Sequence, residues 1–64
     1  MKVKYDREVD ILYIRLTDKA IDESNEDYPG TIIDYDTDGM VVGIEVMNAS
    51  KRMAKPDSVE LEIA

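Results

Sequence analysis

The sequence has 64 residues, with 15 acidic and 8 basic side chains, no cysteine and no histidine, and a formal net charge of −7. This length fits a single domain, residues 1–64, with a small hydrophobic core. Disulfides, thiolate or imidazole metal ligands and an imidazole general base are all excluded. The acidic charge opposes binding to nucleic acids and anionic membranes. The N-terminal residues lack a signal-peptide pattern and no apolar run could span a bilayer, so we expect a cytoplasmic protein without a cofactor.

Residues 2–16 have the pattern of a β-hairpin. Apolar positions alternate with polar ones on both sides of the polar segment 7–10, which is typical of two strands joined by a turn. The apolar positions on the expected core side are Val3, Tyr5, Leu12, Ile14 and Leu16. The next segment, residues 18–30, is strongly acidic and ends in Pro29-Gly30. It is predicted to be a solvated connection with at most a short helical turn, and it is the segment best suited to fold on binding a partner.

A second hairpin is predicted over residues 31–47, and it repeats the first at an offset of 30. "YDTDGMVVGIEV" (35–46) aligns with "YDREVDILYIRL" (5–16), so that aromatic, acidic and apolar positions coincide. A two-residue turn at Asp38-Gly39 would pair Tyr35 with Val42 and Ile33 with Ile44. A three-residue loop with Gly39 as a bulge is the alternative, but it would divide the apolar residues between the two faces.

The second hairpin also carries the residue spacing of an EF-hand calcium loop. Asp34, Asp36, Asp38 and Glu45 stand at ligand positions of that motif. An EF-hand needs an entering helix, whereas the preceding residues are helix-breaking or favour strands. We therefore interpret these acids as turn and solvent-face residues and expect no metal, with weak binding of Ca²⁺ or Mg²⁺ by the four carboxylates as the alternative. Two positions of the repeat differ in charge: Lys4 corresponds to Asp34, and Arg15 corresponds to Glu45. If the two hairpins lie side by side, these opposite charges are expected to meet across strands.

After the second hairpin, residues 48–55 favour a short helix with Asn48 as a cap and Pro56 as its end. Residues 58–63 alternate between apolar and acidic side chains, which indicates a further strand, paired either within the chain or across a dimer. The predicted fold class is α+β and mostly β: two hairpins in one antiparallel sheet, a short C-terminal helix and a possible final strand.

The face of the sheet opposite the core is expected to be mixed rather than polar. Apolar side chains with this parity are candidates for an interface, because exposed apolar groups on a small sheet mark contact surfaces. They are Ile11, Tyr13, Ile32, Val41 and Met47. Self-association as a homodimer is expected because so short a chain builds only a small core.

The two hairpin motifs resemble the small prokaryotic family called domain of unknown function 2283 (DUF2283). The positions that carry the resemblance are Tyr5, Asp6, Glu8, Asp10, Leu12, Tyr13, Ile14, Asp34, Asp36, Asp38, Gly39, Gly43, Ile44, Glu45, Ala49 and Ser50. The resemblance implies no catalytic residues. By association with small toxin-like genes, it implies an antitoxin-like or partner-binding role.

The sequence therefore predicts an interaction module rather than an enzyme. No serine has a histidine to activate it, and 64 residues seldom provide a substrate cleft. The acidic surface suits a basic protein partner, and the module is expected to be a homodimer.

Overall fold

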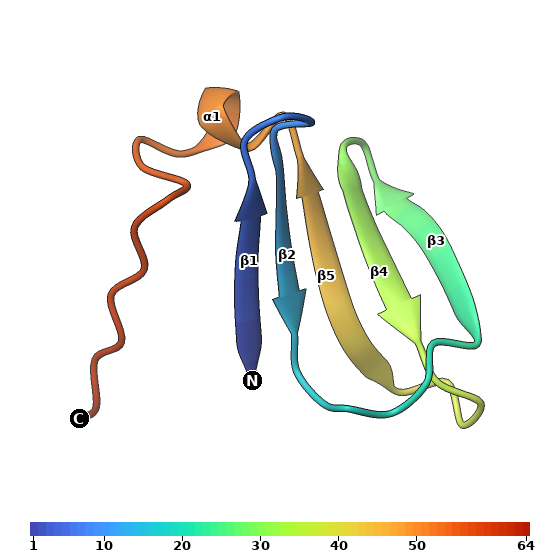
Figure 1. The fold of residues 1–64 in the computed structure, drawn as a ribbon. Coiled ribbons are helices and arrows are strands. Elements are labelled where there is room, and N and C mark those ends of the chain that lie inside the picture. The colour runs from blue at the N-terminus through green and yellow to red at the C-terminus, as the bar shows by residue number, and fades with distance from the viewer.

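The computed structural model describes residues 1–64 as one open antiparallel sheet with a single short helix (Figure 1). The sheet order is β1-β2-β5-β4-β3, so β1 and β3 are its two edges. The elements in chain order are β1 (Lys2–Asp6), β2 (Ile11–Arg15), β3 (Glu23–Tyr28), β4 (Thr31–Tyr35), β5 (Val41–Met47) and α1 (Ala49–Arg52). The predicted α+β class, mostly β with two hairpins and a short helix, is confirmed.

The two predicted hairpins, β1–β2 and β4–β5, lie side by side and are joined by pairing of β2 with β5. Ile14 lies opposite Ile44 at the centre of this pairing. Val3 lies opposite Ile14 in the first hairpin, and Ile33 lies opposite Ile44 in the second. The register is thus the same in both hairpins about the central isoleucine pair, and the repeat at an offset of 30 is a structural repeat.

Alternation along the strands gives the sheet two unlike faces. One face, called the apolar face below, carries Val3, Tyr5, Leu12, Ile14, Thr31, Ile33, Ile44 and Val46 in cross-strand rows. The other, called the mixed face, carries Lys2, Lys4, Ile11, Tyr13, Arg15, Ile32, Asp34, Glu45 and Met47. The apolar side chains that are buried are Leu12, Val42 and Ala49, and most of the others are half-buried. The core is therefore small and lies near β2 and β5, at the centre of the sheet.

Residues 23–28 form strand β3, although a solvated connection was predicted for residues 18–30. The strand pairs with β4, with Ser24 opposite Asp34 and Tyr28 opposite Thr31, and all six of its residues are exposed. Its sequence lacks alternating apolar residues, so only pairing with β4 defines it as a strand. Pro29-Gly30, at the end of the predicted connection, is the turn that joins β3 to β4, and Gly30 has the positive φ of 76° that such a turn requires.

The loop between β4 and β5 is longer than the predicted two-residue turn. Ile33 pairs with Ile44 as expected, but Tyr35 pairs with Val41 instead of Val42 because the register shifts after Asp34. Residues 36–40 form the loop, with Gly39 at a φ of 78°. The shift is a β-bulge that sets two residues of β5 against one of β4 and keeps Val42, which is 1% exposed, in the core.

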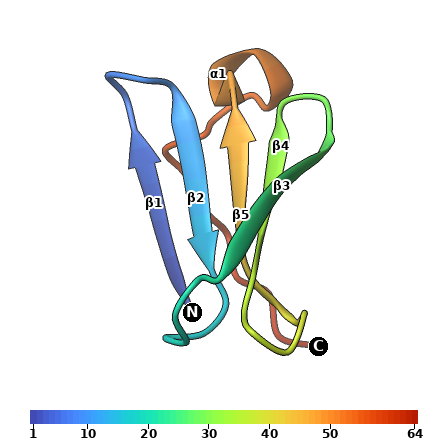
Figure 2. The same cartoon turned by 90° about the vertical axis from the view of Figure 1, so that its right-hand side faces the viewer.

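Helix α1 spans one turn, and its N-terminus is capped from another part of the chain. The helix ends at Arg52 rather than at the predicted Lys55. Asn48 occupies the predicted N-cap position, in a left-handed conformation, but its side chain makes no capping hydrogen bond. Instead, Asp10 caps the helix with two acceptors. Its backbone carbonyl accepts a hydrogen bond from the N–H of Ala49, and its carboxylate accepts one from the N–H of Ser50. Figure 2 shows α1 at the end of the sheet, beside the turns that it contacts.

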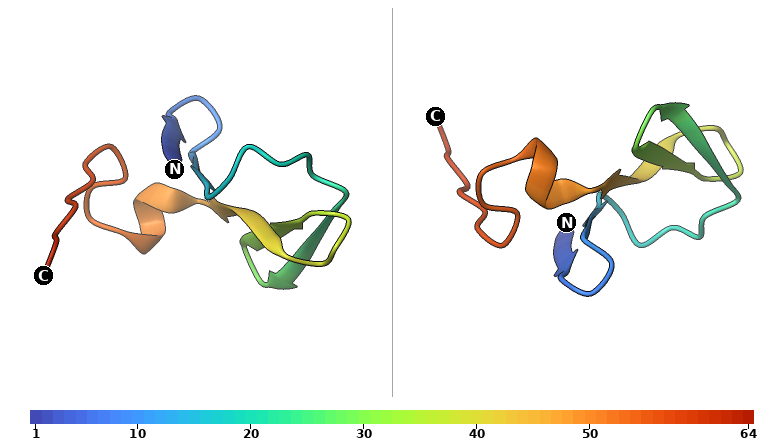
Figure 3. Two further views of the ribbon diagram at one scale, coloured as in Figure 1. Left: turned by 90° about the horizontal axis from the view of Figure 1, so that it is seen from below. Right: turned by 90° about the horizontal axis from the view of Figure 1, so that it is seen from above.

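The segment after α1 runs along the β1 side of the sheet in Figure 1, and its C-terminal end projects outward in Figure 3. Residues 58–64, called the tail below, have no regular secondary structure, so the strand pattern at 58–63 forms no strand in the single chain. No helix of the chain is long and apolar enough to cross a membrane.

Candidate interaction surfaces

A hydrogen-bonded cluster around Asp10 connects the β1–β2 turn to α1. The Asp10 carboxylate accepts hydrogen bonds from the Tyr5 hydroxyl at 2.6 Å, the Ser50 hydroxyl at 2.7 Å and the Ser50 N–H at 3.0 Å. The hydrogen bonds from Tyr5 and Ser50 lower the pKa of Asp10, and the bond to the carboxylate raises the pKa of Tyr5. Asp10 has a φ of 56°, which aspartate tolerates better than most residues. The cluster is thus a structural clamp with every polar group occupied.

Asp36 performs a comparable structural task in the second hairpin. It is 6% exposed, and its Oδ1 accepts hydrogen bonds from the N–H groups of Asp38 and Met40. Those bonds, with Lys19 Nζ 3.8 Å from Oδ2, lower the pKa of Asp36 against the opposing effect of burial. The carboxylate therefore folds back into its own turn and stabilises the loop.

Asp34 and Glu45 form a carboxyl pair on the mixed face. Asp34 is 3% exposed and accepts a hydrogen bond from the Ser24 hydroxyl at 2.6 Å. Burial raises the pKa of Glu45, and hydrogen bonding to Asp34 and the charge of Asp34 raise it further. A Cβ on Gly43 would stand 3.0 Å from Asp34 Oδ2, so any other residue here would require the Asp34 carboxylate to shift. The expectation that Asp34 and Asp36 lie on a solvent-exposed face is wrong, because both are buried.

The four carboxylates of the calcium-loop spacing do not converge. Asp34 and Glu45 meet on the mixed face, while Asp36 is directed into the loop, and no group of three acidic side chains is arranged to hold a metal ion. The expected ion pairs between hairpins are also absent. The Arg15 guanidinium donates to the carbonyl of Lys19, and the salt bridges that form are Arg7–Asp57 and Lys19–Asp36.

The predicted interface residues are divided by the structure. Ile11, opposite Met47, and Tyr13 and Ile32, on either side of Glu45, share the mixed face and are half-buried. Val41 is exposed but pairs with Tyr35, whose parity is that of the apolar face, because of the bulge at Val42. Apolar side chains with a larger exposed fraction lie elsewhere, above all in the tail: Val59, Leu61 and Ile63. A role for the five predicted residues in an interface stays a prediction.

The two edges of the sheet differ in charge. The edge strand β3 carries Glu23, Glu26 and Asp27 and is exposed along its whole length. The edge strand β1 carries Lys2 and Lys4 on the mixed face, where Lys4 Nζ lies 5.6 Å from the centre of the Tyr13 ring. One edge is therefore acidic and the other basic.

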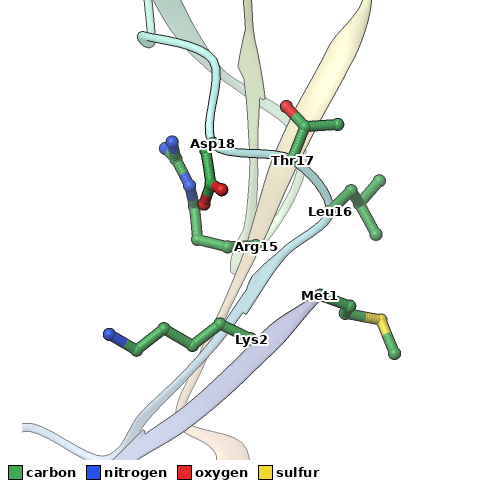
Figure 4. A pocket seen from close by; sticks show the side chains of 6 residues that line it. All are labelled: Met1, Lys2, Arg15, Leu16, Thr17 and Asp18. Carbon is green, nitrogen blue, oxygen red and sulfur yellow. The ribbon is translucent and has the colours of Figure 1, made fainter.

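Two hollows lie near β1. The larger, about 560 Å³, is open and is lined by Met1, Lys2, Arg15, Leu16, Thr17 and Asp18. Figure 4 shows Lys2 and Arg15 on one side of it and Met1 and Leu16 on the other. The smaller, about 320 Å³, lies between the apolar face and the start of the tail and is lined by Val3, Tyr5, Leu12, Pro56, Asp57 and Val59.

The accessible surface is large for a chain of this size. It measures 5026 Å², whereas a folded monomer of this mass exposes about 4,200 Å². The excess arises because the sheet forms a single layer, with only the one-turn helix and the start of the tail near its apolar face. Stable domains pack a second layer against such a face.

The sequence profile of a protein family, described as "Protein of unknown function (DUF2283)", matches residues 2–50. The chain belongs to the DUF2283 family. No curated protein and no solved structure is significantly similar to it. Several positions that carry the resemblance have structural tasks: Tyr5, Asp10 and Ser50 form the clamp, Asp36 holds the second loop, and Gly43 makes room for Asp34. The match ends before the tail.

Sequence reasoning missed two features of these surfaces. The partners of Asp34, which are Ser24 and Glu45, come together only because β3 and β5 flank β4. The acidic edge was assigned to a linker, and the Pro29-Gly30 turn between it and β4 was the one signal that could have suggested a hairpin.

Proposed function

We propose that this DUF2283 protein is a non-enzymatic, cytoplasmic protein–protein interaction module that self-associates as a homodimer. The observation that carries the proposal is the exposed surface of 5026 Å², about 800 Å² above the value for a folded monomer. A standard protein interface buries about 800 Å² on each partner. Covering the incomplete layer with a second copy would remove a comparable area.

The acidic edge supports a second contact, with a basic protein. Strand β3 displays Glu23, Glu26 and Asp27 along a free strand edge, and the chain as a whole carries a net charge of −7. Carboxylates arranged in this way complement a basic surface that acts on nucleic acids, as an antitoxin-like protein would require. Because β3 is already a strand, this binding needs no folding of residues 18–30.

Self-association is tested by measuring molar mass with light scattering during size-exclusion chromatography over a range of concentrations. The expected result is the mass of two chains, falling to that of one chain on dilution. The mass of a single chain at every attainable concentration would overturn the proposal.

The basic partner is tested by co-expression with the product of an adjacent small toxic gene. We expect rescue of growth by the natural chain and loss of rescue by Glu23→Lys/Glu26→Lys. The control is Glu8→Lys/Asp38→Lys, which makes the same change of charge at two exposed turn residues outside β3. Equal rescue by both variants would remove β3 from the interaction.

A further inference from the structure

We propose that residues 58–63 form a sixth strand, which pairs antiparallel with the free edge of β1 in a second copy of the chain. This inference rests on the proposed self-association and assigns the contact that produces it. The exchange is reciprocal: the tail of each protomer completes the sheet of its partner, as in a two-fold symmetric dimer.

The tail has the composition of a strand but no strand partner within the chain. Val59, Leu61 and Ile63 alternate with Glu60 and Glu62, which places apolar and acidic side chains on opposite faces once the segment is extended. The three apolar side chains are 64%, 75% and 86% exposed. So large an exposure of consecutive alternating positions indicates a surface that is covered in the assembled protein.

The free edge of β1 is complementary to this pattern on both faces. Val3 and Tyr5 lie on the apolar face, and Lys2 and Lys4 lie on the mixed face. An antiparallel partner that sets Leu61 opposite Val3 extends the apolar face with Val59, Leu61 and Ile63, so that these side chains join the face that the second copy covers in the proposed dimer.

The same register sets Glu62 opposite Lys2 and Glu60 opposite Lys4, so that opposite charges meet on the mixed face. A slip by one residue would set glutamates beside valine and tyrosine, and the register is therefore specified. The lengths also agree: six residues of strand span about 20 Å, and the five residues of β1 span about 17 Å.

A second copy is the occupant because the chain's own tail is held out of the plane of the sheet. The Arg7–Asp57 ion pair, at 2.8 Å, joins the residue before the tail to the β1–β2 turn. Val59 lines a hollow with Val3 and Leu12, so the tail begins over the apolar face of β1 and β2, and no backbone hydrogen bond joins it to the β1 edge. Figure 3 shows the tail projecting outward from there, where it can reach another molecule.

Charge reversal in two separate chains distinguishes exchange between molecules from pairing within one. One chain carries Lys2→Glu/Lys4→Glu and the other carries Glu60→Lys/Glu62→Lys. Each alone brings like charges together, and we expect its dimer to dissociate at a concentration at least tenfold higher than that of the natural chain. In a mixture, both contacts of the heterodimer join opposite charges, so native mass spectrometry should show recovery of a dimer containing one chain of each kind. Matched controls are Lys51→Glu/Lys55→Glu and Glu23→Lys/Glu26→Lys, which change the net charge equally away from the contact and should leave the dimer intact.

A chain that ends at Asp57 separates failure of this inference from failure of the proposed function. We expect it to keep the circular dichroism of a β-sheet and to elute as a monomer. If the shortened chain remains a dimer, the tail exchange is overturned while self-association stands. If the full chain is a monomer, both are overturned. A third chain carries all four substitutions. If this chain regains the dimer of the natural chain but the mixture of the two charge-reversed chains does not, the tail pairs with its own β1 and the exchange is overturned.

Discussion

The hairpins β1–β2 and β4–β5 use the same local frame but are supported by different neighbours. In each, a tyrosine hydroxyl donates to an aspartate, from Tyr5 to Asp10 and from Tyr35 to Asp27. In each, the residue after the tyrosine is an aspartate whose Oδ1 accepts a backbone N–H two residues further on, at Glu8 in the first hairpin and at Asp38 in the second. The shared sequence pattern therefore encodes the turns.

The difference lies in what each frame is attached to. Asp10 follows Tyr5 within the same hairpin and bonds to the N-terminus of α1, so the first hairpin is attached to the helix. The partner of Tyr35 is on β3, and the second hairpin is fastened to an additional strand. The second loop also adds the bulge at Val42. An internal repeat thus fixes the local geometry, while the residues outside the repeat decide which element packs on each copy.

The largest effect on this comparison is expected from truncating the equivalent core residues Leu12 and Val42. They are 7% and 1% exposed and occupy the same place in the two repeats. Leu12→Ala should lower the free energy of unfolding by about 3 kcal/mol and Val42→Ala by about 2 kcal/mol, because leucine loses more buried volume. Urea denaturation at a fixed protein concentration measures both, with the exposed Val9→Ala as a control that changes little. A larger loss of stability for Val42→Ala than for Leu12→Ala would mean that the conformation of the bulge at Val42 affects stability more than the difference in buried side-chain volume does.

A smaller effect, dependent on pH, is expected at Asp36, whose equivalent in the first hairpin is Asp6. Hydrogen bonds from the N–H groups of Met40 and Asp38 lower the pKa of Asp36 below its ordinary value of 3.8. Its ionised form therefore stabilises the fold above pH 3.8, and this stabilisation is lost as the pH falls through the lowered pKa. Asp36→Asn should destabilise the protein at neutral pH and flatten the fall in stability between neutral and strongly acidic pH. Asp6→Asn should do less, because Asp6 is not buried. Equal acid profiles for the two variants, measured by thermal unfolding, would contradict this ranking.

The predictable part of the fold follows from alternation and turn residues. The apolar parity of residues 2–16 and 31–47 was sufficient to predict both hairpins and the pairing of Ile33 with Ile44, because a slip by one residue would expose every apolar side chain. Strand β3 could not be predicted in this way. Its residues from Glu23 to Asp27 are all polar, so nothing in their periodicity distinguishes a paired edge strand from a loop.

The burial of the acids could not be predicted either. The alternation along β4 correctly places Asp34 and Ile33 on opposite faces of the sheet. The residues that enclose Asp34, however, come from β3 and β5. Asp36 is enclosed by its own loop and by Lys19, from the connection between β2 and β3. The sequence pattern predicted acids on a turn and on a solvent-exposed face, whereas long-range pairing places Asp34 and Asp36 in two different buried settings.

The smallest effect is expected at the equivalent positions Arg15 and Glu45. Burial, together with the hydrogen bond and charge of Asp34, raises the pKa of Glu45 above its ordinary value of 4.5. Because the folded state favours the protonated form, the stability that this form provides is complete below pH 4.5 and is lost as the pH rises through the raised pKa. Glu45→Gln, which is always neutral, should therefore stabilise the protein at neutral pH, and the gain should disappear towards pH 4.5.

Urea denaturation of the natural chain and Glu45→Gln across this range measures the gain, and Arg15→Gln serves as the control without such a profile. The gain should also shrink when Asp34→Asn is already present, because the substituted amide leaves no negative charge next to Glu45. An undiminished gain in that background would assign the raised pKa to burial alone. Asp34 and Glu45 would then be two carboxyl groups that titrate independently of each other, although they lie side by side in the second hairpin.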